Sequence, residues 1–273
     1  MIALPPTDMA FDMISAPRAG AVSTVFLTLL ALPACATKPP TQTGFLTNQA
    51  GMEKVSGTVR AQIERQRDLD GLRGVQKVTL LPAKLQEDGD IPDTITPESR
   101  LLVLGELDRQ LCFRLSRRFE LVGPEDPAAA RVQAVITRLQ ETSATASAAS
   151  AAVSWFLPGG SVRLPVGRGG LSIEARLDTA DGRQAAAMAW SRGAGVVMDE
   201  GSLSEVGDAH RFTSKFADDF TDFLVEPGTQ KRALPPQDPC QQYGARLDLG
   251  RLAAGQVIGL HVPRPSKPTE QDN

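Results

Sequence analysis

Histidine is scarce in this 273-residue chain, which carries only His210 and His261. These two residues do not form the H-x-x-x-H pair that binds zinc from one face of a helix. The chain also lacks the G-x-S-x-G motif, so a Ser–His–Asp hydrolase would have to recruit one of the two histidines. We therefore expect a protein that is not an enzyme and that holds no metal or other cofactor.

An excess of one charge is also missing. The chain has 29 basic and 32 acidic residues, which gives a formal net charge of −3. Nucleic acids and anionic membrane surfaces, as general partners, require a strong basic excess. Aromatic residues make up only 5% of the chain, too few to suggest stacking platforms for bases or sugars. The composition argues against nucleic acid as a partner, whereas 41% of hydrophobic residues suffices for a buried core.

The most specific motif lies near the N-terminus. Residues 19–32 form an apolar run of signal-peptide length, preceded by a basic residue. The run ends in a motif that resembles a bacterial lipobox, in which the cysteine sulfur receives a diacylglyceryl group before cleavage: Leu32, Pro33, Ala34 and Cys35. A transmembrane helix is the alternative, but it needs roughly 20 apolar residues and this run is shorter. We therefore expect cleavage before Cys35 and anchoring in a membrane by acyl chains on that residue.

Two further features bear on the expected membrane location and on the start of the signal peptide. Ala36, not aspartate, follows the cysteine, and by resemblance to proteobacterial sorting rules this favours an outer-membrane lipoprotein that faces the periplasm. Residues 1–12 include Asp8 and Asp12 and no basic residue, which is unusual for the start of a signal peptide. We therefore expect translation to start at Met13, or at Met9.

Hydrophobic periodicity predicts a mixture of strands and helices after the signal. An amphipathic helix should begin at Pro97, capped by Thr96, and end near Arg118, because leucines recur at spacings of three and four. A second helix over residues 208–224 carries a stripe of phenylalanines. Strands are expected over residues 75–82, 119–122 and 131–141, and residues 171–190 alternate as a half-buried hairpin. These elements predict an α+β (or α/β) fold, a single two-layer domain with a mixed sheet covered by two amphipathic helices.

The boundaries of the parts follow from composition. We expect a signal peptide over residues 1–34, a lipid-linked tether over 35–49, the folded domain over 50–226, and a linker and C-terminal tail over 227–273. The tether is polar and contains prolines, which suits a flexible stalk. Apolar residues between Cys240 and Val262 could dock the tail on the domain.

With these elements, the chain resembles a family of bacterial lipoproteins that share domain-of-unknown-function 3313. The resemblance covers about residues 35–226 and rests on three stretches beyond the lipobox. These are Thr43-Gly44-Phe45-Leu46, the segment 164–170 that leads into the strand from Leu171, and Gly207-Asp208-Ala209 at the start of a helix with Phe212 and Phe216. The resemblance implies an envelope location and no established activity.

A glycine-rich loop precedes the hairpin. Its glycines and arginines could form an anion-binding or partner-binding nest, or simply a bent start to the strand: Arg163, Gly167, Arg168, Gly169 and Gly170. A dinucleotide or phosphate-loop fingerprint is not indicated, because a strand and not a helix follows the glycines. The preceding residues 143–156 are rich in alanine and serine, and predict a helix that either contacts a partner or membrane or packs on the sheet.

Two cysteines remain once Cys35 is lipidated. Cys112 and Cys240 form an even pair in an oxidising compartment; the first lies on the predicted helix and the second begins the tail. We expect a disulfide that clamps the tail to the domain. Two buried free thiols are the alternative.

Together these features favour a non-enzymatic, membrane-anchored lipoprotein whose domain binds another envelope component, expected to be a protein. Two alternatives stay open. A lipid-anchored hydrolase acting on cell-wall or lipid substrates would need a cleft that gathers several acids. A module that binds a small ligand or a lipid would need an apolar pocket.

Overall fold

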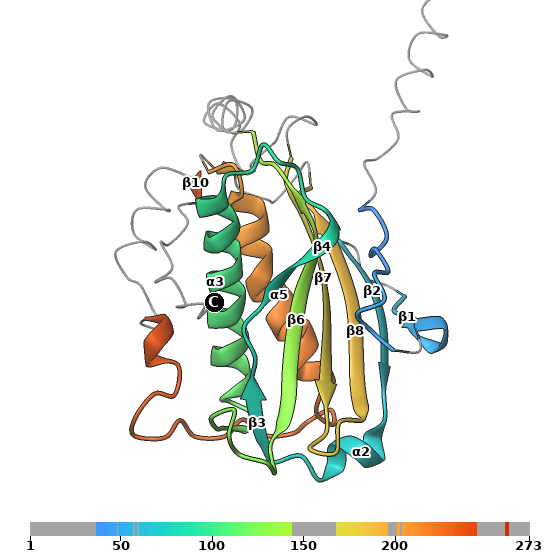
Figure 1. Cartoon of the computed structure of the whole chain (residues 1–273), viewed down its shortest axis with the longest axis vertical. Helices are drawn as coiled ribbons and strands as arrows, with labels where there is room; N and C mark the ends of the chain where they lie inside the picture. The colour runs from blue at the N-terminus through green and yellow to red at the C-terminus, as the bar shows by residue number, and fades with distance from the viewer. Residues whose placement is uncertain are drawn as a thin grey trace, which may run out of the picture. The chain divides into compact units, whose positions relative to one another are not determined.

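The computed structural model describes residues 37–47, 49–56, 58, 60–143, 168–195, 201–202, 204–244 and 260–261. Within them, helices lie against one face of an eight-stranded mixed sheet, so the predicted α+β fold is confirmed (Figure 1). The strands are β1 (Glu53–Lys54), β2 (Ala61–Arg67), β3 (Lys77–Leu80), β4 (Lys84–Asp90), β5 (Glu120–Leu121), β6 (Ala130–Gln140), β7 (Gly170–Asp178), β8 (Gln184–Gly193), β9 (Gly201–Ser202) and β10 (Leu260–His261). The helices are α2 (Leu69–Arg73), α3 (Pro97–Leu115) and α5 (Gly207–Phe223), with 3-10 turns η2 (Gln49–Gly51) and η3 (Gln241–Tyr243).

The sheet runs in the order β1-β2-β8-β7-β6-β3-β5, and β4 also pairs with β6. The pairs β2–β8, β8–β7 and β7–β6 are antiparallel. Strands β3 and β4 run parallel to β6. The two-residue strand β5 pairs parallel with β3 and forms one edge of the sheet. Strands β9 and β10 pair with each other in a separate parallel ladder.

Helix α3 begins as its sequence predicts. Pro97 occupies the first turn, and the Thr96 hydroxyl caps the helix by accepting a hydrogen bond from the Ser99 amide at 3.3 Å. The helix ends at Leu115 and not near Arg118, because the Arg118 amide turns back to the Leu115 carbonyl at 2.8 Å. This tight turn leads the chain directly into β5.

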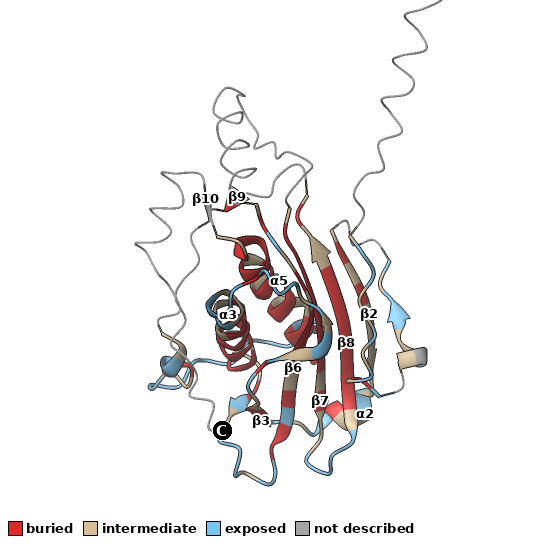
Figure 2. Cartoon of the chain, turned by 45° about the horizontal axis from the view of Figure 1, so that its top comes forward, coloured by how far each residue is buried: buried red, intermediate tan, exposed pale blue. Residues whose placement is uncertain are grey.

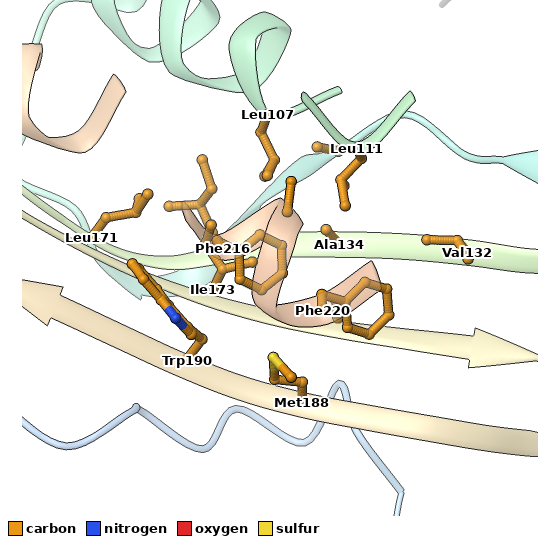
Figure 3. Close-up of a cluster of buried hydrophobic side chains, with 14 of the residues drawn as sticks. Leu107, Leu111, Val132, Ala134, Leu171, Ile173, Met188, Trp190, Phe216 and Phe220 are labelled. Carbon is orange, nitrogen blue, oxygen red and sulfur yellow. The ribbon is translucent and has the colours of Figure 1, made fainter. Parts of the chain in front are cut away.

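The main core lies between the sheet and helices α3 and α5 (Figure 2). Trp190 of β8 contacts Phe216 of α5 edge to face, with ring centroids 5.8 Å apart, and Phe216 stacks on Phe220 at 5.9 Å (Figure 3). All three side chains are fully buried. The predicted phenylalanine stripe of the last helix is therefore part of the core.

The opposite face of the sheet is covered by the N-terminal segment of the described chain, which we call the strap (residues 37–47). Strap and sheet are joined by hydrogen bonds from Ser191 Oγ to the Lys38 carbonyl (2.6 Å), from Arg138 Nη2 to Thr41 Oγ1 (2.7 Å) and from Arg176 Nη1 to the Phe45 carbonyl (2.9 Å). Leu46 packs on Ala187 and Ala189 of β8. The segment expected to be a flexible tether over residues 35–49 is, from Thr37 onward, part of the folded unit.

This cover also corrects the prediction of a half-buried hairpin. Ser172 and Glu174 of β7, which alternate with core residues, are 0% exposed. Glu174 accepts hydrogen bonds from the Thr43 hydroxyl and from Gln49 Nε2, the latter at 3.1 Å. Burial nevertheless raises the pKa of the Glu174 carboxyl, because desolvation outweighs the hydrogen bond from Thr43. Alternation in the sequence shows which face a side chain points to, but not whether a further layer covers that face.

Candidate functional site

The chain that follows α5 returns to the domain and is fastened to it at several points, among them a hydrogen bond from Arg118 Nη1 to the Thr229 carbonyl. We call residues 226–244 the arm. The Arg232 amide donates to the Arg117 carbonyl at 2.8 Å. Further along, Cys240 forms a disulfide with Cys112 of α3, with Cα atoms 5.8 Å apart, so the predicted disulfide is confirmed and the alternative of two free thiols is wrong.

The disulfide sits in a small apolar cluster of its own. Cys112, Phe113 and Cys240 are all buried, and Leu80, Leu121 and Tyr243 pack against them. The Asp238 carboxylate accepts a hydrogen bond from the Cys240 amide at 2.9 Å, which fixes the turn before η3. The arm is therefore held by packing and hydrogen bonding as well as by the covalent link.

A cavity of about 740 Å³ opens between the arm and the domain, and we call it the arm cleft. One wall is the end of α3 and the edge strand β5, lined by Ser116, Phe119, Glu120 and Leu121. The other wall is the arm, with Arg232, Ala233, Pro235, Gln237, Asp238, Pro239, Gln241 and Gln242. The volume lies within the range of roughly 300–1,000 Å³ that is typical of ligand pockets.

The edge strand β5 forms part of one wall of the cleft, and its backbone amides have defined directions there. The amides of Glu120 and Val122 donate to the carbonyls of Gln76 and Val78, in the segment that contains β3, at 2.9 and 3.1 Å. Because successive residues of a strand alternate, the Leu121 amide points away from β3, toward the edge of the sheet, where no further strand pairs among the described residues. A free strand edge can pair with another extended chain.

One buried titratable group of α3, Asp108, lies within electrostatic reach of the arm. Asp108 is 3% exposed, and its Oδ1 accepts a hydrogen bond from the Ala83 amide at 2.8 Å. Burial raises the pKa of Asp108 to about 7, and the Ala83 hydrogen bond only partly offsets it. The pKa of Tyr243 on the arm is raised by its own burial and further by the charge of Asp108. Tyr243 of the arm therefore lies within electrostatic reach of a buried carboxyl group whose pKa is about 7.

No histidine is among the described residues that line the arm cleft. His210 is 2% exposed, with its Nε2 3.6 Å from Oε2 of Glu106, which is itself hydrogen-bonded to Arg109 and Gln110. The described residues contain no group of three or more histidine, cysteine or acidic side chains arranged to hold a metal ion. The prediction that the protein is not an enzyme stays a prediction.

The structure describes only some of the other residues that the sequence predicted to form a site. The lipobox Leu32, Pro33, Ala34 and Cys35, and the loop residues Arg163 and Gly167, lie outside the described residues, as do residues 144–156. In the described part of the loop, Arg168 Nη1 donates to the Ala194 carbonyl at 2.8 Å and the Gly169 amide donates to Asp208 at 2.9 Å. Gly170 is the first residue of β7. The amide that a nest would offer to an anion is thus already bonded to a carboxylate of the chain itself.

Sequence reasoning placed no site in the arm. It read the arm as a linker, because the segment is polar and rich in proline. The one available signal was the predicted disulfide, since a linker fastened at its far end becomes a closed loop against the domain.

The sequence profile of a family described as a protein of unknown function (DUF3313) matches residues 41–220. The chain belongs to this family. No curated protein matches it. Among solved structures, the chain is similar to PelC dodecamers from Paraburkholderia phytofirmans. A single-residue PelC variant aligns at a TM-score of 0.36 with 8% identity, over 60% of this chain and 98% of that one. A second PelC structure aligns at 0.35 with 11% identity, over 57% and 94%.

Within the described ranges, no helix combines the length and the apolar character needed to cross a bilayer.

Proposed function

We propose that the protein is a membrane-anchored lipoprotein of the bacterial envelope whose folded domain binds another envelope protein in the arm cleft. The observation that carries the proposal is the Cys112–Cys240 disulfide. Disulfides persist in oxidising compartments and are rare in the cytosol, so this bond supports export. The lipobox ending at Cys35 supplies the anchor.

The same bond supports the choice of the arm cleft as the binding site. It fastens one end of the arm, while the bond from Arg232 to Arg117 fastens the other, so both walls are in place before a partner arrives. A preformed site avoids the entropy cost of ordering a loop on binding. The edge of the sheet at Leu121, which no further strand pairs with in the described part of the chain, and the mixed polar and apolar lining suit an extended polypeptide, which would add a strand to the sheet.

The anchor is tested by the intact mass of the protein extracted from membranes of its native host. We expect a mass equal to residues 35–273 plus acyl chains, and a gain of two hydrogens on reduction. An unmodified mass that includes residues before Cys35 would overturn the lipoprotein proposal. Unchanged mass on reduction would remove the support that the disulfide gives.

The binding site is tested by a photo-crosslinking amino acid placed at Gln237, which is exposed and lines the cleft. The matched control carries the same amino acid at Glu87, an exposed residue of β4. We expect a specific crosslinked protein from Gln237 but not from Glu87, and its loss when Cys112 and Cys240 are both changed to serine. Equal crosslinking at both positions, or none at Gln237, would contradict the proposal.

A small-ligand module is the second candidate, because the volume of the arm cleft also fits a small molecule. Native mass spectrometry of the purified protein distinguishes the two. A bound small molecule that disappears in the variant lacking Cys112 and Cys240, together with no protein crosslink, would favour this candidate.

A further inference from the structure

A second cavity lies where the C-terminal ends of α3 and α5 meet the start of the arm. Its volume is about 400 Å³, which is within the range typical of sites for small ligands. No described residue lines both this cavity and the arm cleft. We call it the arginine pocket, and its charged and polar side chains come from the end of α3, from α5 and from the arm: Arg114, Arg117, Arg118, Asp218, Thr221, Asp222 and Lys231.

Two of the three arginines are neutralised within the pocket. Helices α3 and α5 lie side by side, and two ion pairs one turn apart join them (Figure 1). Arg114 donates to Asp218, and Arg118 Nη2 donates to Asp222 Oδ1 at 2.8 Å. Arg118 also donates to the Thr229 carbonyl of the arm. Both aspartates of the pocket are therefore already paired with a cation of the chain.

The other two cations of the pocket are not neutralised in this way. Neither Arg117 nor Lys231 forms an ion pair with an acidic side chain in the described part of the chain. The Arg232 amide donates to the Arg117 carbonyl at 2.8 Å, so the backbone keeps the arm beside the end of α3. With four cationic and two acidic side chains, the lining of the pocket has a formal charge of +2.

The pocket also contains a hydroxyl group that lacks a partner. Thr221 is 2% exposed, and its Oγ1 has no hydrogen-bond partner among the described residues. A threonine within a helix can satisfy this group on the carbonyl one turn earlier, but Thr221 does not do so. A buried hydroxyl without a partner is unfavourable. Because Thr221 lines the pocket, an oxygen atom of a ligand bound there can accept this hydrogen.

Helix stability alone does not explain this arrangement. The macrodipole of α3 favours cations at its C-terminal end, which accounts for Arg114 in the last turn. It does not account for Lys231, which the arm contributes, or for the unpartnered hydroxyl of Thr221. Helix α5 has no basic residue in its own last turn. The excess of cations and the unpartnered donor together indicate a site for an anion.

We propose that the arginine pocket binds a doubly charged phosphate group, carried by a small ester or present as the free ion. A phosphate monoester has nearly two negative charges at neutral pH and three strong acceptor oxygens. These match the charge of +2 and the donors of Arg117, Lys231 and Thr221. The site is separate from the arm cleft and requires neither the lipid anchor nor a partner protein, so its failure would leave the function proposed above untouched.

Binding is tested by isothermal titration calorimetry of the full protein, with its disulfide oxidised, at about pH 8, where phosphate is doubly charged. The probes are glycerol 3-phosphate, inorganic phosphate, succinate and glycerol, all at the same ionic strength. We expect both phosphates to bind more tightly than succinate, and glycerol not to bind. Tighter binding of glycerol 3-phosphate identifies an ester as the ligand, and otherwise the free ion is the ligand. Succinate that binds as tightly as phosphate, or no binding of either phosphate, would overturn the proposal.

The position of the phosphate is tested by removing the two cations that lack an acidic partner. Arg117→Gln and Lys231→Gln should each weaken phosphate binding by at least about tenfold, because each removes a charge-assisted hydrogen bond. Lys84→Gln is the matched control, since it removes an exposed cation from β4, on another part of the sheet. It should leave binding unchanged. Equal affinities in all three variants would place the phosphate outside the arginine pocket.

Thr221→Val separates a binding role of the hydroxyl from a structural one, because valine keeps the shape of threonine without its donor. Phosphate binding should weaken several-fold. The free energy of unfolding without phosphate should stay the same or rise, since the hydroxyl has no partner to lose in the described part of the chain. A variant that is less stable without phosphate and binds it as well as the wild type would refute the assignment of Thr221.

Discussion

Replacing Asp108 by asparagine should stabilise the fold at neutral and alkaline pH and leave it unchanged at about pH 4 and below. The carboxyl is 3% exposed and accepts a hydrogen bond from the Ala83 amide. Asparagine has nearly the same shape and can accept that bond through its own oxygen, but it carries no charge to desolvate. The substitution therefore isolates the cost of ionising a buried acid.

The magnitude follows from the pKa of Asp108, which burial raises from 3.8 to about 7. At this carboxyl, the folded state then holds its proton more tightly than the unfolded state. The contribution of Asp108 to the free energy of unfolding is therefore greatest below about pH 4 and falls as pH rises toward about 7. Each tenfold change in proton affinity is worth about 1.4 kcal/mol, so the full cost of the ionised form is roughly 4 kcal/mol. The Asp108→Asn variant should recover that amount above about pH 7.

The assay is urea unfolding of the wild type and the variant, both oxidised and in the same detergent, at several values between about pH 4 and pH 8. Other titrating groups contribute equally to both proteins and cancel in the difference. The exposed Glu87→Gln variant serves as the control for removing one negative charge. A difference between wild type and Asp108→Asn that is the same at both ends of this pH range would refute the reasoning from burial.

Three further changes probe other parts of the structure by unfolding and exchange measurements. Changing Cys112 and Cys240 together to serine should cost about 5 kcal/mol for a closed loop of 128 residues, and reduced wild type should match the variant; unequal values would point to a role beyond the crosslink. Phe216→Ala should cost about 3–5 kcal/mol in urea unfolding, and Phe216→Leu clearly less; equal losses would contradict the packing. Thr43→Val should cost about 1–3 kcal/mol by removing a bond to the buried Glu174, with faster hydrogen exchange confined to the strap; unchanged exchange there would show that the bond does not hold it.

The elements that could be predicted are those whose local pattern and tertiary environment agree. Helix α3 carries its cap at Thr96 and its leucine spacing within one short segment, and α5 carries its phenylalanine stripe in the same way. The β7–β8 hairpin is marked by its turn, where Gly182 adopts a φ of +82° that glycine takes without strain. In each case the information lies within about 20 residues of sequence.

The strap and the arm could not be predicted as structure because their contacts are distant in sequence. Thr43 bonds to Glu174, and Arg232 bonds to Arg117. The sequence around each of these residues gives no indication of its partner. Both segments are polar and contain prolines, a composition that indicates a linker when taken alone. The disulfide is the one distant contact that could be predicted, because the number of cysteines suggests a pair whatever their separation in the sequence.

The start of the strap at Thr37 and the arm cleft lie toward opposite ends of β6, whereas the strap itself runs along the sheet as far as Gln184. The cleft adjoins β5 and β3, and β3 pairs with Ala130 at the start of β6. The other end of β6, at Gln140, pairs with Gly170 of β7, which in turn pairs with Gly193 beside Thr37. The intervening length of strand is about 35 Å. An anchor at Cys35, two residues before Thr37, would therefore leave the cleft open well clear of the headgroups, where a partner can reach it without displacing lipid.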